Sequence, residues 1–547
     1  MVRNRAVWAV PLVVVTVVGM LLTGCTNGTK AASGSDTAAA NGNTPQSGGS
    51  LVVAMAGDAP TINPDVTSGT PDRMVGCNFY PSLVRQSAKF QIEPWLATSW
   101  KISKDGLQYT FQLAPEAKWQ DGVPLTSADV KYTLLSVSSK FGPSFAAAGA
   151  AIKGIETPDD NTVVISLKYT FGPFLGSLTC ANNAGILPKH VFEGKDVLSN
   201  PATTNTPVSA GPFLLKDWVR GDHITLSANP DYWQKGRPYL DQIVYQEIPQ
   251  DSSRVLALQS GEVDYINGYY LPLSSLTTIK KDSNLDTVGG GLPSDHQIIL
   301  NVQKAPLNKP AVRQALMTAL DRNYFQKNIF SGNGKVVNSA IDQDITWAYN
   351  PAVNLSKMYP YDPAKANKML DAAGLKKVNG VRFSMDLVFD STRADYVQWA
   401  SAIKQYWKAV GVDVNLKGSE RTVELTQVFT DRNFDATLQA YSTQGDPALG
   451  ISRSYVTSSI QKAPFTNGSG YSNPIVDQLF KDGLSAATNA DRAVPYFKVQ
   501  TILAKDLPVL PMVQETATGA FRKNVHGTDQ GVVNNYAYMD GFWKSGK

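Results

Sequence analysis

The sequence predicts a mixed α/β fold, and the best evidence lies between about residues 295 and 500. In that region, stretches with the helical spacing of apolar residues alternate with stretches in which every second residue is apolar. One helix is expected from about Asp395 to Gly411, and the alternating residues Val412, Val414 and Leu416 predict a strand directly after it. Helices that alternate with strands are typical of an α/β lobe.

Start and stop signals support three further helices. Thr126 and Asp129 have the spacing of a capping box, Pro310 suits a first helical turn, and Asp362 and Gly374 suit the two ends of a third helix. Trp399 and Trp407 are expected in the core, since aromatic residues at helical spacing usually pack inward. The expected apolar faces are Val312, Ala315, Leu316, Ala319 and Leu320; Ala366, Met369, Leu370 and Ala373; and Tyr396, Trp399, Ala400, Ile403 and Trp407.

Length and composition indicate a large globular protein. A chain of 547 residues exceeds one ordinary hydrophobic core. Apolar residues make up 43% and charged residues 18%, which argues against disorder over most of the length. The net charge of +4 includes no cluster of basic residues, so nucleic acid is not an expected partner.

The first 24 residues are typical of a secretory signal peptide. Arg3 and Arg5 precede an apolar stretch without charges, and small residues follow it before Cys25. The ending Leu22-Thr23-Gly24-Cys25 resembles the bacterial lipobox, in which the cysteine receives a diacylglycerol group. That resemblance implies a lipid anchor at Cys25 on the extracytoplasmic face of the cell membrane.

Residues 25–49 are expected to form the lipidated terminus and a flexible tether. Ser, Thr, Asn, Gly and Ala dominate this segment, which therefore cannot bury enough apolar surface to fold. The folded body is expected to begin near Ser50, because Leu51 to Met55 has the composition of a buried strand. No later apolar run is long enough to cross a membrane.

Patterns that would indicate an enzyme or a metal protein are missing from the sequence. There is no GxSxG nucleophile motif, no GxxxxGK[ST] phosphate loop and no HExxH zinc motif. None of the three cysteines belongs to a CxxC pair, and the four histidines are far apart in sequence. We therefore predict neither catalysis nor a bound cofactor or metal, and, without an ATP site, a partner must supply any energy that the function needs.

A long series of motifs runs through the chain from residue 94 onward. The first motifs are Pro94 to Trp100 (PWLATSW), Asp105 to Leu113 (DGLQYTFQL), Trp119 to Thr126 (WQDGVPLT) and Ala128-Asp129-Val130. The later motifs are Gly211-Pro212-Phe213, Asn229 to Trp233 (NPDYW), Gly261 to Asp264 (GEVD), Val312 to Arg322, Asp362 to Gly374 and Leu507 to Pro511. Their order resembles that of the large bacterial solute-binding family that serves oligopeptide, dipeptide and nickel importers.

The resemblance implies a two-lobe, periplasmic-binding-protein-like clamshell with an extra subdomain inserted in the first lobe. The solute would bind between the lobes, which close on it and deliver it to permease subunits with ATPase subunits behind them. We expect a monomer, with a glycine hinge at Gly289 to Gly291. The expected ranges are 50–290 for the first lobe, about 85–205 for the inserted subdomain, 291–507 for the second lobe and 508–547 for the return to the first.

The solute itself is less well defined by the sequence, and peptides are the first expectation. In peptide-binding members of the family, an aromatic residue is followed by an aspartate that takes the ammonium group of the peptide. Here Tyr441 matches the aromatic residue, and either Gln444 or Asp446 holds the later position. We expect Asp446 as the ammonium partner, with Tyr441 and Trp347 as pocket walls. An oligosaccharide, a nickel chelate, haem or a siderophore, and a ligand-sensing role, remain alternatives.

The remaining cysteines, Cys77 and Cys180, are expected to form a disulfide. Once Cys25 carries lipid, they are the only pair left in an oxidising compartment. In the family that this sequence resembles, the two positions lie near the two ends of the inserted subdomain. Because the two ends of an insertion must approach each other, the two cysteines could meet. The alternative is two separate buried cysteines that pack as small apolar residues.

Overall fold

The computed structural model describes residues 44–67, 69–87, 91–289, 294–515, 518–528, 532–533 and 536–546. The expected signal peptide at 1–24 and the predicted lipidation site Cys25 lie outside the described residues. The expected tether also lies outside them, apart from residues 44–49. No helix in the described part of the chain is both long and apolar enough to span a membrane.

The first lobe is built on a mixed sheet with the strand order β12-β19-β11-β1-β10-β9-β8. The first strand of the chain lies near the middle of this sheet, parallel to β10 and β11, and its residues Leu51 and Val53 are fully buried. The apolar run predicted as a buried strand is therefore confirmed. The strands are β1 (Ser50–Met55), β8 (Phe213–Val219), β9 (His223–Ala228), β10 (Gln242–Glu247), β11 (Tyr265–Ile266), β12 (Leu285–Gly289) and β19 (Thr518–Arg522).

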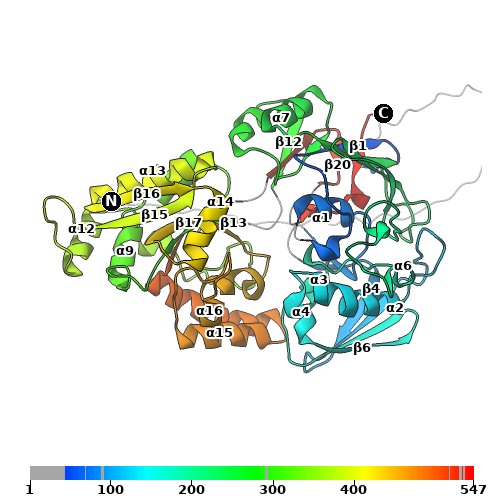
Figure 1. The fold of residues 1–547 in the computed structure, drawn as a ribbon, viewed down its shortest axis with the longest axis horizontal. Helices are drawn as coiled ribbons and strands as arrows, with labels where there is room; N and C mark the ends of the chain where they lie inside the picture. The colour runs from blue at the N-terminus through cyan, green and yellow to red at the C-terminus, as the bar shows by residue number, and fades with distance from the viewer. Residues whose placement is uncertain are drawn as a thin grey trace, which may run out of the picture. The chain divides into compact units, whose positions relative to one another are not determined.

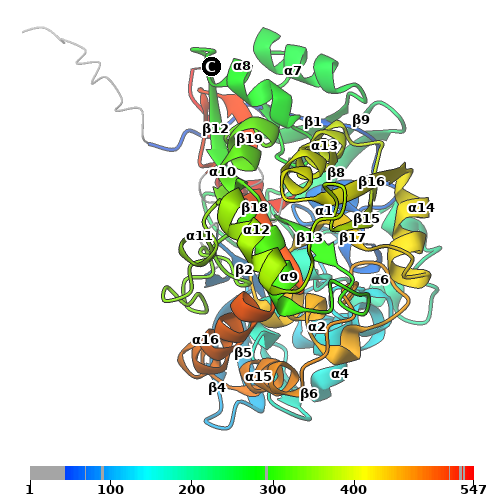
Figure 2. The same cartoon turned by 90° about the vertical axis from the view of Figure 1, so that its left-hand side faces the viewer.

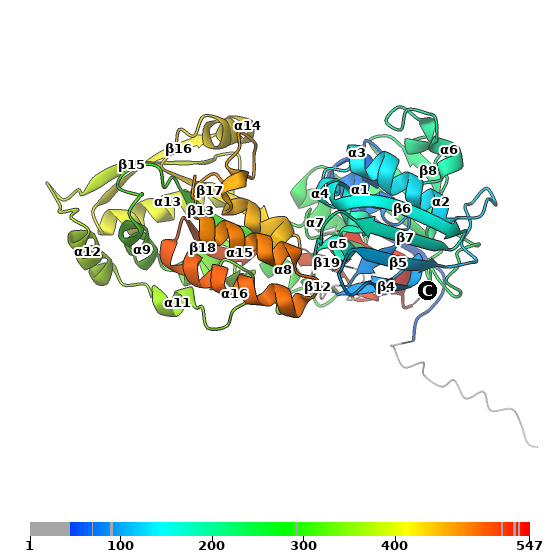
Figure 3. The same cartoon turned by 90° about the horizontal axis from the view of Figure 1, so that it is seen from below.

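A separate antiparallel sheet is inserted between β1 and β8. It has the order β4-β5-β7-β6, with β4 (Ala97–Ile102), β5 (Gln108–Leu113), β6 (Ile152–Asp159) and β7 (Thr162–Leu167). Helices α2 (Ser127–Tyr132), α3 (Ser139–Phe141) and α4 (Ala146–Ala151) lie along one side of it (Figure 3). The predicted capping box is present, since the backbone N–H of Thr126 donates to Asp129 Oδ2 at 2.8 Å. This sheet lies within the range expected for the insertion.

The second lobe has its own mixed sheet, with the order β14-β18-β13-β17-β15-β16. Helices α9 (Pro310–Thr318), α12 (Pro363–Ala372) and α13 (Ala394–Ala409) lie around the strands β15 to β17 (Figure 1). Helices α15 (Pro474–Ser485) and α16 (Asn489–Asp506) run side by side (Figures 1 and 2). The strands are β13 (Ser294–Leu300), β14 (Lys335–Val336), β15 (Phe383–Asp390), β16 (Val412–Ser419), β17 (Ala436–Ser442) and β18 (Val509–Glu515).

The helices predicted for the second lobe are confirmed almost to the residue. α9 has Pro310 in its first turn, and Asp362 caps α12 by accepting a hydrogen bond from the backbone N–H of Lys365 at 2.8 Å. Trp399 and Trp407 of α13 are fully buried, as expected for core residues. Strand β16 follows α13 directly, which confirms the predicted helix–strand pair.

The chain passes between the lobes twice, and the second passage differs from the prediction. The first lies between Gly289 and Ser294, where most of the expected glycine hinge is outside the described residues. The return was expected at 508, but β18 pairs with β13 and β14 in the sheet of the second lobe. The chain re-enters the first sheet only at β19, so the predicted boundary at 508 is wrong for residues 509–515.

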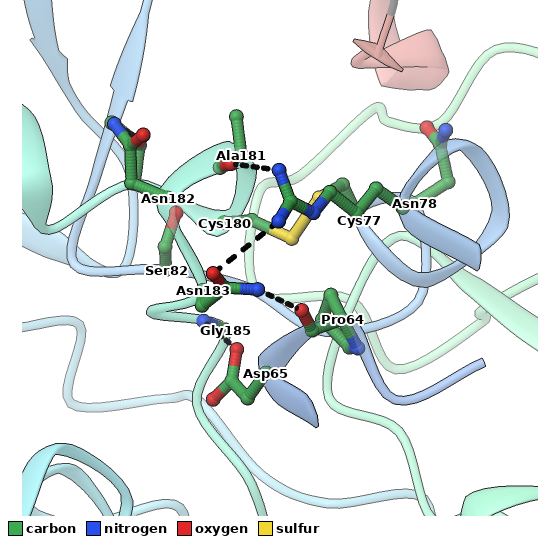
Figure 4. Close-up of a disulfide and its surroundings, with 12 residues drawn as sticks. Pro64, Asp65, Cys77, Asn78, Ser82, Cys180, Ala181, Asn182, Asn183 and Gly185 are labelled. Atoms are coloured by element: carbon green, nitrogen blue, oxygen red, sulfur yellow. Dashed lines mark hydrogen bonds between the residues drawn. A yellow bond between two sulfur atoms is a disulfide. The ribbon is translucent and has the colours of Figure 1, made fainter. Parts of the chain in front are cut away.

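Cys77 and Cys180 are joined by a disulfide with their Cα atoms 5.6 Å apart. Cys77 directly follows α1 (Thr70–Gly76), and Cys180 begins the short 3₁₀ turn η3 (Cys180–Asn182). Both are fully buried against aromatic side chains that include Trp95. Asn183 lies beside the bridge and donates to the backbone carbonyl of Pro64 at 2.6 Å (Figure 4). The predicted pairing is therefore present in the structure.

Candidate functional site

A cavity of about 670 Å³ is lined by residues of both lobes. Its volume is within the range of small-molecule and peptide pockets. The first lobe contributes the segment 268–274, which follows β11, together with Asp251 at the start of α7 (Asp251–Ser260). The second lobe contributes the strand residues His296, Ala440 and Glu515 and also Arg393, which directly precedes α13. Residues that are far apart in sequence thus line one cavity together.

The acidic side chains of this cavity are each paired with a base. Nε2 of His296 lies 2.7 Å from Oε2 of Glu515, and the Arg393 guanidinium lies 2.6 Å from Asp395. Asp251 forms an ion pair with Arg254. The carboxylates therefore form local pairs, and the cavity offers a polar lining without a large excess of either charge.

Tyr269 supplies an exposed aromatic ring to the same cavity. It is 60% exposed, which is unusual for a ring of this size on a protein surface. Its backbone N–H donates to Oδ1 of the buried Asn267 at 2.8 Å, which fixes the start of the segment that carries it. An exposed ring on an anchored loop is suited to contact a bound solute.

A second cavity, of about 250 Å³, brings together three of the four residues predicted for ligand binding. Trp347, Gln444 and Asp446 line it from the second lobe, and Tyr109 and Gly172 line it from the inserted subdomain. Gln444 has a φ of +52° in the loop that follows β17. This left-handed conformation turns the chain sharply between β17 and the helical turn that begins at Pro447.

Asp446 is already neutralised within its own lobe. Its two carboxylate oxygens accept hydrogen bonds of 2.6 and 2.7 Å from the guanidinium group of Arg492 on α16. The Arg492 side chain is 2% exposed and that of Asp446 is 14% exposed. Asp446 also accepts a hydrogen bond of 2.9 Å from the backbone N–H of Ala448. A peptide ammonium would have to compete with a bidentate, largely buried ion pair.

Tyr441 does not share this cavity, although it was predicted as a pocket wall. Its side chain is buried, and its hydroxyl donates to the backbone carbonyl of Thr466 at 2.8 Å. Burial raises the pKa of this hydroxyl well above its usual value. It borders a small internal space of about 10 Å³. The strand period turns Tyr441 toward the core of the second lobe, and a structural role fits it better.

Comparison with known protein families matches residues 91–463 to bacterial extracellular solute-binding proteins, family 5 Middle. The match covers more than half of the chain. The chain belongs to this family. Its two-lobe fold, with one mixed sheet in each lobe, is that of the family 5 solute-binding proteins.

Relatives of this family 5 protein include receptors for peptides. The oligopeptide-binding protein AppA of Bacillus subtilis is 28% identical over 539 residues, which is 96% of either chain. The glutathione-binding protein GsiB of Salmonella typhimurium is 26% identical and covers 87% of this chain and 91% of its own. These names describe what the relatives bind.

Solved structures agree in fold over nearly the whole chain. AppA from Bacillus subtilis in complex with a nonapeptide superposes with a TM-score of 0.72 and is 26% identical, covering 92% of this chain and all of its own. DppA from Helicobacter pylori in complex with the peptide STSA gives a TM-score of 0.71 at 25% identity, covering 92% of this chain and 99% of its own.

Several functional candidates in this family 5 chain escape prediction from sequence. Arg492 is separated from Asp446 by 46 positions, and nothing in the sequence around Arg492 marks it as the partner. His296 and Glu515 come from neighbouring strands that are more than 200 residues apart in the chain. Tyr269 is one of 22 tyrosines, and only its exposure in the structure sets it apart. The segment Gly261 to Asp264, a family motif shortly before it, was the nearest available signal.

Proposed function

We propose that this protein is the lipid-anchored, extracytoplasmic receptor of an ABC importer, and that it binds peptides between its two lobes and delivers them to a membrane permease. The main support is the cavity of about 670 Å³ that both lobes line in a family 5 chain. The peptide-binding relatives make peptides the first class of solute to test.

Strand β17 offers main-chain groups for a peptide. β17 pairs with β13 along its whole length, whereas β15 pairs only with Ala436 and Thr437. In the described pairing, residues 438–441 therefore have a neighbouring strand on one side only, and Ala440 lines the larger cavity. An extended peptide could add to this edge through backbone hydrogen bonds, which recognise any peptide irrespective of its side chains.

Gln444 is the better candidate for the amino end of the peptide. It follows β17, it lines the adjoining cavity, and its neutral amide can accept a hydrogen bond from an ammonium group or from an amide. Asp446 is held by Arg492. This assignment means that the receptor does not require a free ammonium group, so N-blocked peptides and other solutes without an amine also become candidates.

Titration calorimetry with paired peptides tests this assignment. We expect the wild type to bind free-amine and N-acetylated forms of one peptide with affinities within about tenfold of each other. Gln444→Asp should strengthen binding of the free-amine form by roughly 10–100-fold, because a hydrogen bond to a charged group contributes about 1.5–3 kcal/mol. It should not strengthen binding of the acetylated form.

Gln478→Asp is the matched control for that experiment. Gln478 is an exposed residue of α15 and does not line either cavity, so the same change of charge there should leave both affinities unchanged. Equal affinities of wild type and Gln444→Asp for the free-amine form would remove Gln444 from the amino-end position. No binding to any member of a mixed peptide library would exclude peptides, and native mass spectrometry of the purified protein would then identify the solute it carries.

Anchoring is proposed to depend on Cys25 alone. Cys25→Ser should leave unprocessed precursor or release the protein from the membrane fraction, because the thiol that accepts diacylglycerol is removed. Metabolic labelling with a radioactive fatty acid, followed by cell fractionation, measures both effects. Lipid label on the Cys25→Ser protein, with processing at residue 25, would contradict the proposal.

A further inference from the structure

Two buried carboxyl groups face each other in the second lobe, outside the cavities described above for the solute. Asp295 lies on β13 and is 8% exposed, and Asp342 lies in the connection after β14 and is 1% exposed. Two adjacent carboxylates that are both ionised repel each other strongly when they are buried. Such a pair needs a positive charge, either from a basic side chain, a metal ion or a proton.

The surroundings supply no base for this pair. The side chains that face Asp342 are Asp295, Asp344, Thr443 and Gln514. Asp344 is a third acid, and it is itself paired with Lys335 at 2.7 Å. Tyr455, which also lies near both carboxyls, is neutral at physiological pH. Unlike every acid that lines the two solute cavities, Asp295 and Asp342 therefore have no cationic partner among the described residues.

Several polar atoms around these two carboxyl groups also lack hydrogen-bond partners in the described structure. Both oxygens of Asp342 and Oδ1 of Asp295 are buried without a completed hydrogen bond in the described structure, and so are two donors that face Asp342, Thr443 Oγ1 and Gln514 Nε2. Asp295 and Thr443 line the same internal space of about 10 Å³, which is close to the size of one water molecule. Carboxylate oxygens only accept hydrogen bonds, whereas a protonated carboxyl also donates one. The neutral donors Thr443 and Gln514 leave both carboxylate charges in place, whereas a single added proton would give one carboxyl group a donor toward the other and remove one of the two charges.

We propose that Asp295 and Asp342 form a proton-binding site that holds one shared proton at neutral pH. Burial and the neighbouring carboxylate both favour this state: the pKa of Asp295 is raised well above its usual value, and that of Asp342 is raised to about 6, mainly by burial. The dyad then titrates as a unit in two steps, and the shared proton is the one retained to the higher pH.

A proton fits this site better than a metal ion. The third acid, Asp344, is paired with Lys335, and no group of three or more His, Cys, Asp or Glu residues in the described part of the chain is arranged to hold a metal. The small internal space that Asp295 borders leaves room for one water molecule at most.

The site is placed to influence the loop that carries Gln444. Asp295 pairs with Tyr441 across β13 and β17, and Thr443, which faces Asp342, directly precedes Gln444. Loss of the shared proton would place two negative charges beneath this loop. If the solute is bound as proposed above, its affinity should fall at alkaline pH in the wild type and vary less in a variant without the dyad.

The sign of the effect on stability follows from the raised pKa values. The folded state holds protons that the unfolded chain releases near pH 4, so stability is highest at acidic pH and falls as the pH rises through the folded pKa values. For each retained proton, the folding equilibrium constant should fall by up to about tenfold per pH unit. Asp65 in the first lobe, whose pKa burial raises to about 7, contributes a similar slope, so the effect of the dyad must be isolated with variants.

Infrared spectroscopy of the full-length protein tests the proton directly, without any solute. We expect a C=O stretching band of protonated, buried carboxyl groups in the wild type at pH 7, and a weaker band in Asp295→Asn/Asp342→Asn, in which the contribution of Asp65 remains. The melting temperature of the wild type should fall relative to that of the double variant by at least roughly 3 °C between pH 5 and pH 8. Asp413→Asn, which changes an exposed acid of β16 in the same lobe, is the control and should follow the wild type.

Three results would overturn the proposal. The first is the absence of a difference in the carboxyl band between wild type and double variant at pH 7. The second is an equal pH dependence of melting in both proteins. The third is a rise in the wild-type melting temperature with Na⁺ or Ca²⁺ that the double variant lacks, which would identify a metal-ion site. Failure of peptide binding at every pH would count against the proposed function and leave these readouts unaffected.

Discussion

Asp446→Ala should destabilise the second lobe by about 3–5 kcal/mol, because it leaves the charge of Arg492 buried without a partner. The Arg492 side chain is 2% exposed, and its other polar contacts are a backbone carbonyl at Gly483 and weaker contacts of 3.4 and 3.5 Å. None of these carries a negative charge. Loss of the cap on Ala448 would add to the effect. Thermal unfolding followed by circular dichroism measures the change.

A double-mutant cycle separates this structural role from ligand binding. Arg492→Met alone leaves Asp446 unpaired and should also destabilise, whereas Asp446→Ala/Arg492→Met removes both charges and should recover much of the lost stability. Asp231→Ala is the matched control, since the pair of Asp231 with Lys118 is exposed and should contribute less than about 1 kcal/mol. An unchanged melting temperature with loss of peptide affinity in Asp446→Ala would instead support Asp446 as the ammonium partner.

Local structure was predictable because its signals are local. The helix that begins at Pro310 and the cap at Asp362 depend on residues within four positions of each other, and the structure confirms both. The boundary at 508 was not predictable in this way. An apolar strand such as β18 has the same pattern in either sheet, and only its pairing with β13, about 200 residues earlier in the chain, determines the lobe.

The candidate site shows the same contrast between local signals, which the sequence reveals, and long-range contacts, which it does not. Trp347, Gln444 and Asp446 were selected from short sequence contexts, and they do line one cavity. The sequence does not show that Arg492 neutralises Asp446, since that contact depends on how α16 packs beside the loop after β17. Tyr441 was selected by its place in a motif, but the alternation of β17 turns its ring into the core. The larger cavity draws residues from seven separate stretches of chain, and none of those residues was predicted.

Removal of the Cys77–Cys180 disulfide should cost the first lobe about 2–5 kcal/mol. The bridge closes a loop of about 103 residues that contains the inserted sheet, and chain-entropy estimates for loops of that length reach about 4.7 kcal/mol. Non-covalent contacts also hold the two ends of the insertion together. Arg73 donates to the carbonyl of Ala181 at 3.1 Å. The backbone N–H of Gly185 donates to Asp65 at 2.8 Å (Figure 4). The reduced protein should therefore fold to the same structure with a lower melting temperature.

Cys77→Ala/Cys180→Ala, measured beside wild type with and without dithiothreitol, tests this expectation. The double variant should melt several degrees below the oxidised wild type and should not respond to the reductant. Reduced wild type should approach the double variant, with a small remaining difference because each alanine leaves space among the aromatic side chains around the bridge. A melting temperature within about 1 °C of the oxidised wild type would mean that the hydrogen bonds of Arg73, Asn183 and Asp65 already hold the two ends of the insertion together.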